Sequence, residues 1–140
     1  MSKRAIFHLS FPVSSLAASV AFYEGCLGAV RGRDGGAWCD LVLFGHQLTL
    51  HEKPEQVQPR EARGVRHFGA VLDWGALDVL LQRLQSHRPA TTWNFALRDA
   101  GTPEEHAKLL LDDPDGNLIE LKAYRARDPV AIAQGQPAQP

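Results

Sequence analysis

The sequence predicts an α+β fold made of two βαβββ modules, which together form a curved mixed sheet with a concave cleft. Two observations carry this prediction. A strand, a helix and further strands over residues 5–52 are followed by the same order over residues 65–124. A histidine also lies on the first strand of each half, at His8 and His67. Such internal repetition indicates a duplicated unit, and it decides the predicted fold.

Length and charge limit what the chain can be. Its 140 residues suit one domain, which we expect to span residues 1–124. The net charge of −1 gives no electrostatic footprint for nucleic acid or for an anionic membrane. No apolar run approaches the ~18 residues of a membrane span, and the N-terminal residues lack the pattern of a signal peptide. Residues 125–140, rich in Pro, Gln and Ala, are predicted to be a disordered tail.

The two cysteines indicate the compartment. Cys26 and Cys39 lie in apolar surroundings without the spacing of a metal or redox motif. They are expected to be buried thiols rather than a disulfide, as in a reducing compartment. We therefore predict a cytoplasmic protein.

The first module follows from apolar periodicity. Alternation over residues 5–12 predicts a strand with His8 on the less apolar face. Ser14 or Ser15 can cap a helix that Gly25 and Gly28 end. The segments AWCDLVLF and HQLTLHE then indicate a strand hairpin or meander, and residues 53–63 a linker.

The second module repeats this order. VRHFGAVLD predicts a strand, ALDVLLQRLQSH a helix with leucines at positions i, i+3, i+4 and i+7, and TTWNFALR another strand. The last two strands flank the turn Asp112–Asn117 in the stretch LLLDDPDGNLIELKAY, because Pro and Gly favour a tight reversal there. On the returning strand, Glu120 points away from the apolar face, so it needs a partner.

The strand pattern places several polar residues on the predicted concave surface. His8, His67 and Glu120 all lie opposite apolar strand faces, and His51 on the fourth strand is expected to be the counterpart of Glu120. Two imidazoles and a carboxylate suit a divalent ion such as Fe(II), Mn(II), Zn(II) or Ni(II), with coordination positions left for a small-molecule substrate. An ion pair of Glu120 with a nearby arginine is the alternative.

The paired modules, the strand histidines and the segment DPDGNLIELK resemble the vicinal oxygen chelate superfamily, which includes glyoxalase I, extradiol dioxygenases, fosfomycin-resistance transferases and bleomycin-resistance proteins. FHLSFPV, RHFGAVLDW and LDDPDGNLIELKAY resemble a small, dioxygenase-like branch. The resemblance implies metal ligands at His8, His67 and Glu120, and often a homodimer. Glyoxalase I has a glutamate ligand on the fourth strand, where this chain has His51, so a glyoxalase I activity is less favoured.

The resemblance leaves three functions open. An extradiol-type dioxygenase with Fe(II) is the first expectation, with His51 as a fourth ligand or an acid–base group and Tyr124 as a hydrogen-bond donor at the mouth of the site. A glyoxalase-type isomerase or lyase with Zn(II) or Ni(II) is the second. The third is a metal-free protein that sequesters a ligand. The sequence does not specify the substrate.

Overall fold

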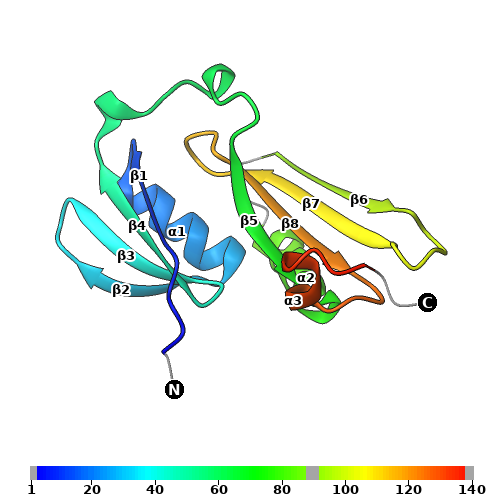
Figure 1. Ribbon diagram of the computed structural model, residues 1–140. Coiled ribbons are helices and arrows are strands. Elements are labelled where there is room, and N and C mark those ends of the chain that lie inside the picture. The colour runs from blue at the N-terminus through cyan, green and yellow to red at the C-terminus, as the bar shows by residue number, and fades with distance from the viewer. Residues whose placement is uncertain (1–2, 88–91, 138–140) are drawn as a thin grey trace. The chain divides into compact units, whose positions relative to one another are not determined.

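The computed structural model describes residues 3–87 and 92–137. The chain divides into two compact units (Figure 1). The first unit runs to Gly64 and includes Pro114–Gly116, and the second comprises Val65–Asp113 and the chain from Asn117 onward. Each unit has a four-stranded mixed sheet. The predicted α+β class with two βαβββ modules is thereby confirmed.

The first unit pairs its first strand with its last. Its elements are β1 (His8–Val13), α1 (Leu16–Leu27), β2 (Val30–Asp34), β3 (Trp38–Leu43) and β4 (His46–Glu52). The strand order is β1-β4-β3-β2, with β1 and β4 parallel and the other neighbours antiparallel. The linker contains two short 3₁₀ turns, Pro54–Gln56 and Arg60–Ala62.

Helix α1 begins and ends where its capping residues allow. The Ser15 hydroxyl accepts a hydrogen bond from the Ala18 amide, which satisfies one of the free N–H groups at the helix start. Gly28 ends the helix with φ 71°, a left-handed conformation that glycine adopts without strain. Gly25 lies inside the helix, so the expectation that it contributes to the helix end is wrong. The buried face of α1 packs against β3 and β4.

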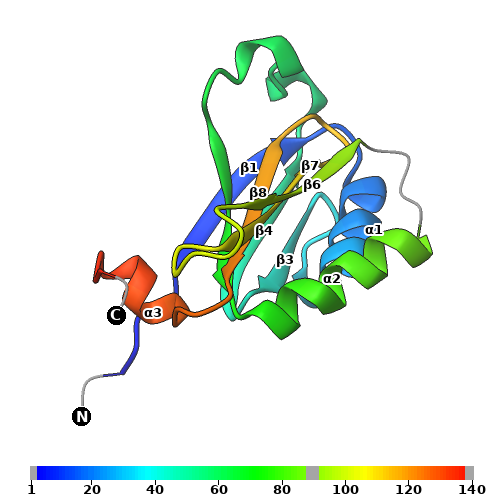
Figure 2. The same ribbon diagram turned by 90° about the vertical axis from the view of Figure 1, so that its right-hand side faces the viewer.

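The second unit repeats the arrangement and adds a short helix. Its elements are β5 (His67–Leu72), α2 (Trp74–His87), β6 (Trp93–Arg98), β7 (His106–Asp112), β8 (Leu118–Tyr124) and α3 (Pro129–Ala133). The strand order is β5-β8-β7-β6, again with the first and last strands parallel. Figure 2 shows α2 running along one side of this sheet, where Leu77, Leu80 and Leu84 are buried.

The expected disorder after residue 124 is wrong for part of the tail. Asp128 caps α3 by accepting hydrogen bonds from the amides of Val130 and Ala131, and α3 packs against β5. This capping signal is a local one, because Asp followed by Pro is a common helix start. Residues 138–140 of the predicted tail, and residue 91 of the predicted strand TTWNFALR, lie outside the described residues.

Each sheet has two chemically different faces. We call the face turned away from α1 or α2 the distal face. On β8, Ile119, Leu121 and Ala123 are fully buried on the helix side, so Glu120 and Lys122 lie on the distal face. In the described ranges 3–87 and 92–137, no helix has the length and apolarity to cross a bilayer.

Candidate metal centre

The turn between β7 and β8 fixes the start of the strand that carries Glu120. Both carboxylate oxygens of Asp113 accept hydrogen bonds from Asn117, one from its backbone amide at 2.9 Å and one from its side-chain amide at 2.8 Å. Gly116 has φ 83°, which other residues rarely adopt. The Asp115 carboxylate accepts from the Ser14 amide at 3.0 Å, within the first unit. The DPDGN segment thus has a structural role in this chain.

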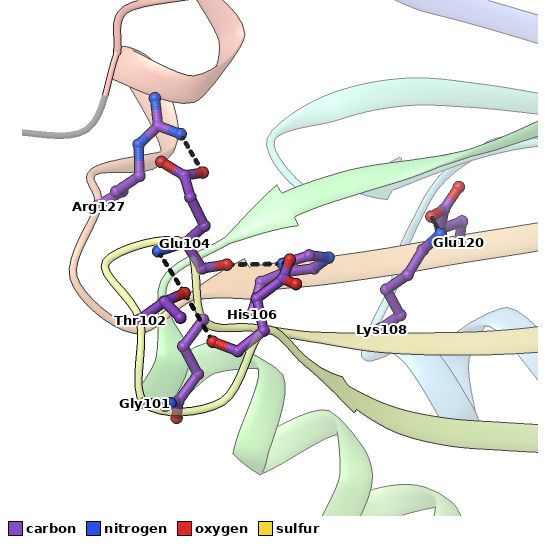
Figure 3. A network of polar contacts seen from close by, with 9 residues as sticks. Gly101, Thr102, Glu104, His106, Lys108, Glu120 and Arg127 are labelled. Atoms are coloured by element: carbon purple, nitrogen blue, oxygen red, sulfur yellow. Dashed lines mark hydrogen bonds and ion pairs between the residues drawn. The ribbon is translucent and has the colours of Figure 1, made fainter.

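Glu120 has two partners in its own unit. Its Oε2 lies 2.9 Å from Nε2 of His67 on β5, and its Oε1 lies 3.0 Å from Nζ of Lys108 on β7. Figure 3 shows the Lys108 side chain directed from β7 toward Glu120. The sequence-based alternative of an arginine partner is therefore wrong, because the cation is a lysine and lies diagonally across the β7–β8 ladder.

These partners also set the charge of Glu120. Burial favours the neutral acid and is the largest single influence on its pKa. The hydrogen bond and charge of Lys108, together with the charges of Lys122 and His67, outweigh burial and hold the pKa below its ordinary value. Glu120 is therefore a carboxylate at neutral pH, which is the form that binds a metal ion.

The tautomer of His67 follows from its second hydrogen bond. Nδ1 lies 2.7 Å from the carbonyl oxygen of Val65, which can only accept, so Nδ1 carries the hydrogen. In the neutral ring, Nε2 then presents a lone pair to the Glu120 carboxylate. Two acceptors, Nε2 of His67 and Oε2 of Glu120, would repel each other at this distance. A proton on Nε2, or a cation bound by both groups, makes the contact favourable. Metal-bound histidines commonly have this second hydrogen bond.

The spacing of the two atoms also fits a metal. In octahedral coordination, ligand atoms that are about 2.1 Å from the ion and at right angles to each other lie about 3 Å apart. The 2.9 Å between His67 Nε2 and Glu120 Oε2 is compatible with that separation, and equally with a hydrogen bond from a protonated His67. The residues of the second unit therefore fit two adjacent positions of a divalent metal centre.

His8 has the same orientation in the first unit. Its Nδ1 lies 2.7 Å from Oε1 of Gln47, an acceptor, so its Nε2 is also the nitrogen with a lone pair. His46 has the reverse arrangement, because its Nδ1 accepts from the Phe7 amide at 3.0 Å. Of the two histidines on this sheet with a described ring hydrogen bond, His8 is thus the one whose Nε2 has the lone pair that a metal ligand needs.

The predicted ligands fall in different units. His67 and Glu120 are brought together in the second unit, and His8 belongs to the first. Among residues 3–87 and 92–137, no group of three or more His, Cys, Asp or Glu side chains is arranged to hold a metal ion. The three-residue ligand set therefore stays a prediction.

The strand register changes the expected role of His51. His8 lies opposite Gln47 in the first sheet, and His67 lies opposite Leu118 in the second. Two residues further along the last strand of each unit, Thr49 is therefore equivalent to Glu120. The expectation that His51 is the counterpart of Glu120 is wrong by two residues. His51 lies four residues from Gln47, about 13 Å along the strand. Its acid–base or ligand role stays a prediction.

Tyr124 lies at a similar distance from Glu120 along β8 in the second unit. It is four residues from Glu120 on the same strand face, about 13 Å along the strand. Its ring stacks on His106 with centroids 4.7 Å apart, and the Arg127 guanidinium lies 5.5 Å from its centroid. This packing accounts for Tyr124 without a substrate, so its catalytic role also stays a prediction.

The loop between β6 and β7 is held by polar contacts (Figure 3). Glu104 accepts from Arg127 at 2.9 Å, and its carbonyl oxygen lies 2.9 Å from Nδ1 of His106. Glu105 accepts from the Gly101 amide at 2.8 Å and pairs with Arg125. The loop is therefore attached to the segment between β8 and α3.

Two residues of the site have no role in the sequence-based prediction. Gly69 lies directly opposite Glu120, and a Cβ there would be 1.7 Å from the Glu120 carbonyl oxygen. A glycine in the middle of a strand signals close backbone approach, so its position could have been noticed. Lys108 could not have been noticed in that way, because its contact with Glu120 depends on the register of β7 and β8.

Comparison with known proteins identifies the family. The model of the Glyoxalase/Bleomycin resistance protein/Dioxygenase superfamily matches residues 5–121, a range that contains His8, His67 and Glu120. A solved glyoxalase/bleomycin resistance protein/dioxygenase from Alicyclobacillus acidocaldarius is 30% identical, with a TM-score of 0.74, and the match covers 86% of this chain and 91% of that one.

Two further relatives extend the comparison. The virulence protein STM3117 of Salmonella typhimurium is 28% identical over 125 residues, which are 85% of this chain and 83% of that protein. The fosfomycin resistance protein FosX of Listeria monocytogenes shares the fold, with a TM-score of 0.67 and 17% identity over 87% of this chain and 94% of that one. The chain belongs to the glyoxalase/bleomycin resistance protein/dioxygenase superfamily.

Proposed function

We propose that the protein is an enzyme that uses a divalent metal ion to act on a small substrate with two adjacent oxygen atoms. One observation carries the proposal. Nε2 of His67 lies 2.9 Å from a Glu120 oxygen, with the other ring nitrogen held by the Val65 carbonyl. Family membership supports it, because the three predicted ligands fall within the matched residues.

Each residue has a definite task in this proposal. His67 and Glu120 hold the ion together with His8, and the Val65 carbonyl orients the His67 ring. Lys108 holds Oε1 of Glu120, so Oε2 is the oxygen left for the ion. A divalent ion bound by these residues would lower the pKa of the substrate oxygens and hold them in place.

The specific reaction that we propose is an extradiol-type dioxygenation with Fe(II). Two histidines and one carboxylate make a ligand set that leaves coordination positions for a substrate and O₂. His51 is the proposed acid–base group and Tyr124 a proposed hydrogen-bond donor. An isomerase or lyase with Zn(II) or Ni(II) would use the same three ligands, so the reaction has to be decided by assay.

A metal-free binding protein is the second candidate, and one observation favours it. Lys108 and a protonated His67 can together satisfy both oxygens of Glu120 without an ion. The bleomycin resistance proteins named in the superfamily and FosX indicate that resistance to small molecules is a function to test as well.

Metal analysis separates these candidates. We would purify the chain without a metal-affinity tag, offer it Fe(II), Mn(II), Zn(II) and Ni(II) anaerobically, and measure bound metal per chain. The proposal predicts one ion per chain, lost in His67→Ala and in Glu120→Gln. His87→Ala is the matched control, because His87 also directs Nδ1 to a backbone carbonyl, that of Arg83, but lies at the end of α2.

The reaction is then tested with the loaded protein. Oxygen uptake with a panel of catechols supports the dioxygenase, whereas conversion of a hemithioacetal of methylglyoxal and glutathione without oxygen uptake contradicts it and supports the isomerase. A folded protein that binds none of the four metals would overturn the enzymatic proposal. The expected homodimer is tested by analytical ultracentrifugation of the same preparation.

A further inference from the structure

Two lysines face each other beside the candidate metal centre. Lys108 on β7 and Lys122 on β8 are directly opposite in the antiparallel ladder, and both lie on the distal face with Glu120. Like charges in this position destabilise a sheet, because the Cβ atoms of opposed residues are only about 5 Å apart. A negative charge nearby would relieve this repulsion.

Glu120 supplies only part of that charge. It pairs with Lys108 at 3.0 Å, while Lys122 has no hydrogen bond or ion pair with any residue in the described ranges. Arg98 on β6 adds a third permanent positive charge to the same face, next to His106 in the ladder. The other carboxylate on this face of β7, Asp112, lies at the far end of the strand and is buried.

The scaffold itself does not require the lysine pair. By the register of each sheet, the first unit has Trp38 opposite His51 at the positions where the second has Lys108 opposite Lys122. The same strand arrangement is thus built there with an aromatic residue and a histidine. The cation pair is specific to the unit that contains His67 and Glu120.

We propose that Lys108 and Lys122 bind an anionic group, a carboxylate, phosphate or phosphonate, on the molecule that this site takes up. Lys122 is two residues from Glu120 on β8, about 7 Å along the strand, so one small molecule can reach both the lysines and the metal centre. The substrate of the proposed enzyme would then be a small molecule that has two adjacent oxygen atoms and also carries an anionic group. Its description as a substrate rests on the proposed function, but the anion site itself does not need the metal.

The test uses the full chain without metal, so its outcome is independent of the metal analysis. Inorganic phosphate and, separately, benzoate are titrated at constant ionic strength, and binding is followed by the backbone amide NMR signals of β7 and β8. We expect saturable shifts at Lys108 and Lys122. A preference for phosphate indicates a phosphate or phosphonate group, and a preference for benzoate indicates a carboxylate.

Variants distinguish this site from general surface charge. Lys122→Met should weaken binding at least tenfold and Lys122→Arg should retain it, whereas Lys53→Met, in the linker, should leave it unchanged. Glu120→Gln should tighten binding severalfold, because it frees Lys108 from its carboxylate partner. The dispersion of the NMR spectrum verifies that each variant is folded, and Lys122→Gln replaces Lys122→Met if the latter is not.

Two results would overturn the proposal. One is the absence of saturable shifts with both anions in the wild-type chain. The other is equal affinity of the wild-type chain and the folded Lys122 variant. Neither result affects the metal-binding prediction, and a chain that binds no metal can still bind the anion.

Discussion

The two units share a strand order and a register, but equivalent positions in the two sheets carry different types of side chain. His8 in the first unit and His67 in the second occupy equivalent positions on the first strand. The first unit has Thr49 at the position equivalent to Glu120. On the neighbouring third strand, Asp40 lies opposite Thr49 in the first unit, whereas Leu110 lies opposite Glu120 in the second. The acidic residue has thus changed strand between the two copies.

The change of strand decides what each carboxylate can do. Asp40 accepts from the Thr49 hydroxyl at 2.6 Å and from Arg33 at 2.7 Å, so both of its oxygens are committed to partners on its own sheet. Glu120 instead has one oxygen on Lys108 and the other facing a histidine. The duplicated backbone therefore carries one carboxylate whose partners are Thr49 and Arg33, and one that faces a predicted metal ligand, His67.

The largest expected effect is a loss of stability in the second unit, at a position where the first unit should tolerate a substitution. Gly69→Ala places a Cβ against the Glu120 carbonyl, so β5 and β8 must separate, and we expect a loss of about 3 kcal/mol or more in the free energy of unfolding. Chemical denaturation measures it. Ser10→Ala at the equivalent position of the first unit is the control, and an equal loss in both variants would contradict the comparison.

The next test concerns the contribution of the first unit to the metal centre. His8→Ala should weaken metal binding at least tenfold, because it removes the third predicted ligand. His46→Ala should leave it unchanged, since the His46 Nδ1 is already occupied by the Phe7 amide. Isothermal titration with Zn(II) compares the two variants. Equal affinity for both would remove His8 from the ligand set.

A smaller effect appears in the acid stability of the first unit. The Thr49 hydrogen bond lowers the pKa of Asp40 most, burial opposes this, and the hydrogen bond and charge of Arg33 add to the lowering. A carboxyl whose pKa is lower in the folded state stabilises the fold above its unfolded pKa of about 3.9, and this contribution is lost as the pH falls through the folded value.

Asp40→Asn removes that contribution. The variant should be less stable than the wild-type chain at pH 6, and the difference should shrink as the pH is lowered below about 4. Thermal unfolding at several pH values measures the difference. A constant gap between the two proteins across this range would show that the charge of Asp40 has no part in stability.

The smallest expected effect is a gain in stability. The Ser19 hydroxyl is fully buried in α1 and, within the described residues, has no hydrogen-bond partner. Ser19→Ala removes this unsatisfied group and introduces a better helix former, so we expect a gain of about 1 kcal/mol. Denaturation with urea would reveal it, and a loss of stability would mean that the hydroxyl is satisfied in solution.

Local patterns in the sequence were sufficient for most of the fold. Alternating apolar residues identify strands such as β5 and β8, and helical spacing of Leu77, Leu80 and Leu84 identifies α2. The strand β2 was less clear, because Gly32 and the charged residues around it mask the alternation. The cap that Asp128 forms at α3 was overlooked within a tail whose composition is typical of disorder.

The sequence by itself determined the two-module architecture, the faces on which His8, His67 and Glu120 lie, and the turn that precedes Glu120. These features depend on periods of two and about 3.6 residues, which neighbouring residues encode. Only the tertiary structure decided that Thr49 rather than His51 matches Glu120, that Gly69 allows β5 to approach β8, and that Lys108 and Lys122 face each other. Cross-strand register depends on pairing between segments far apart in the chain, and alternation along one strand does not specify it.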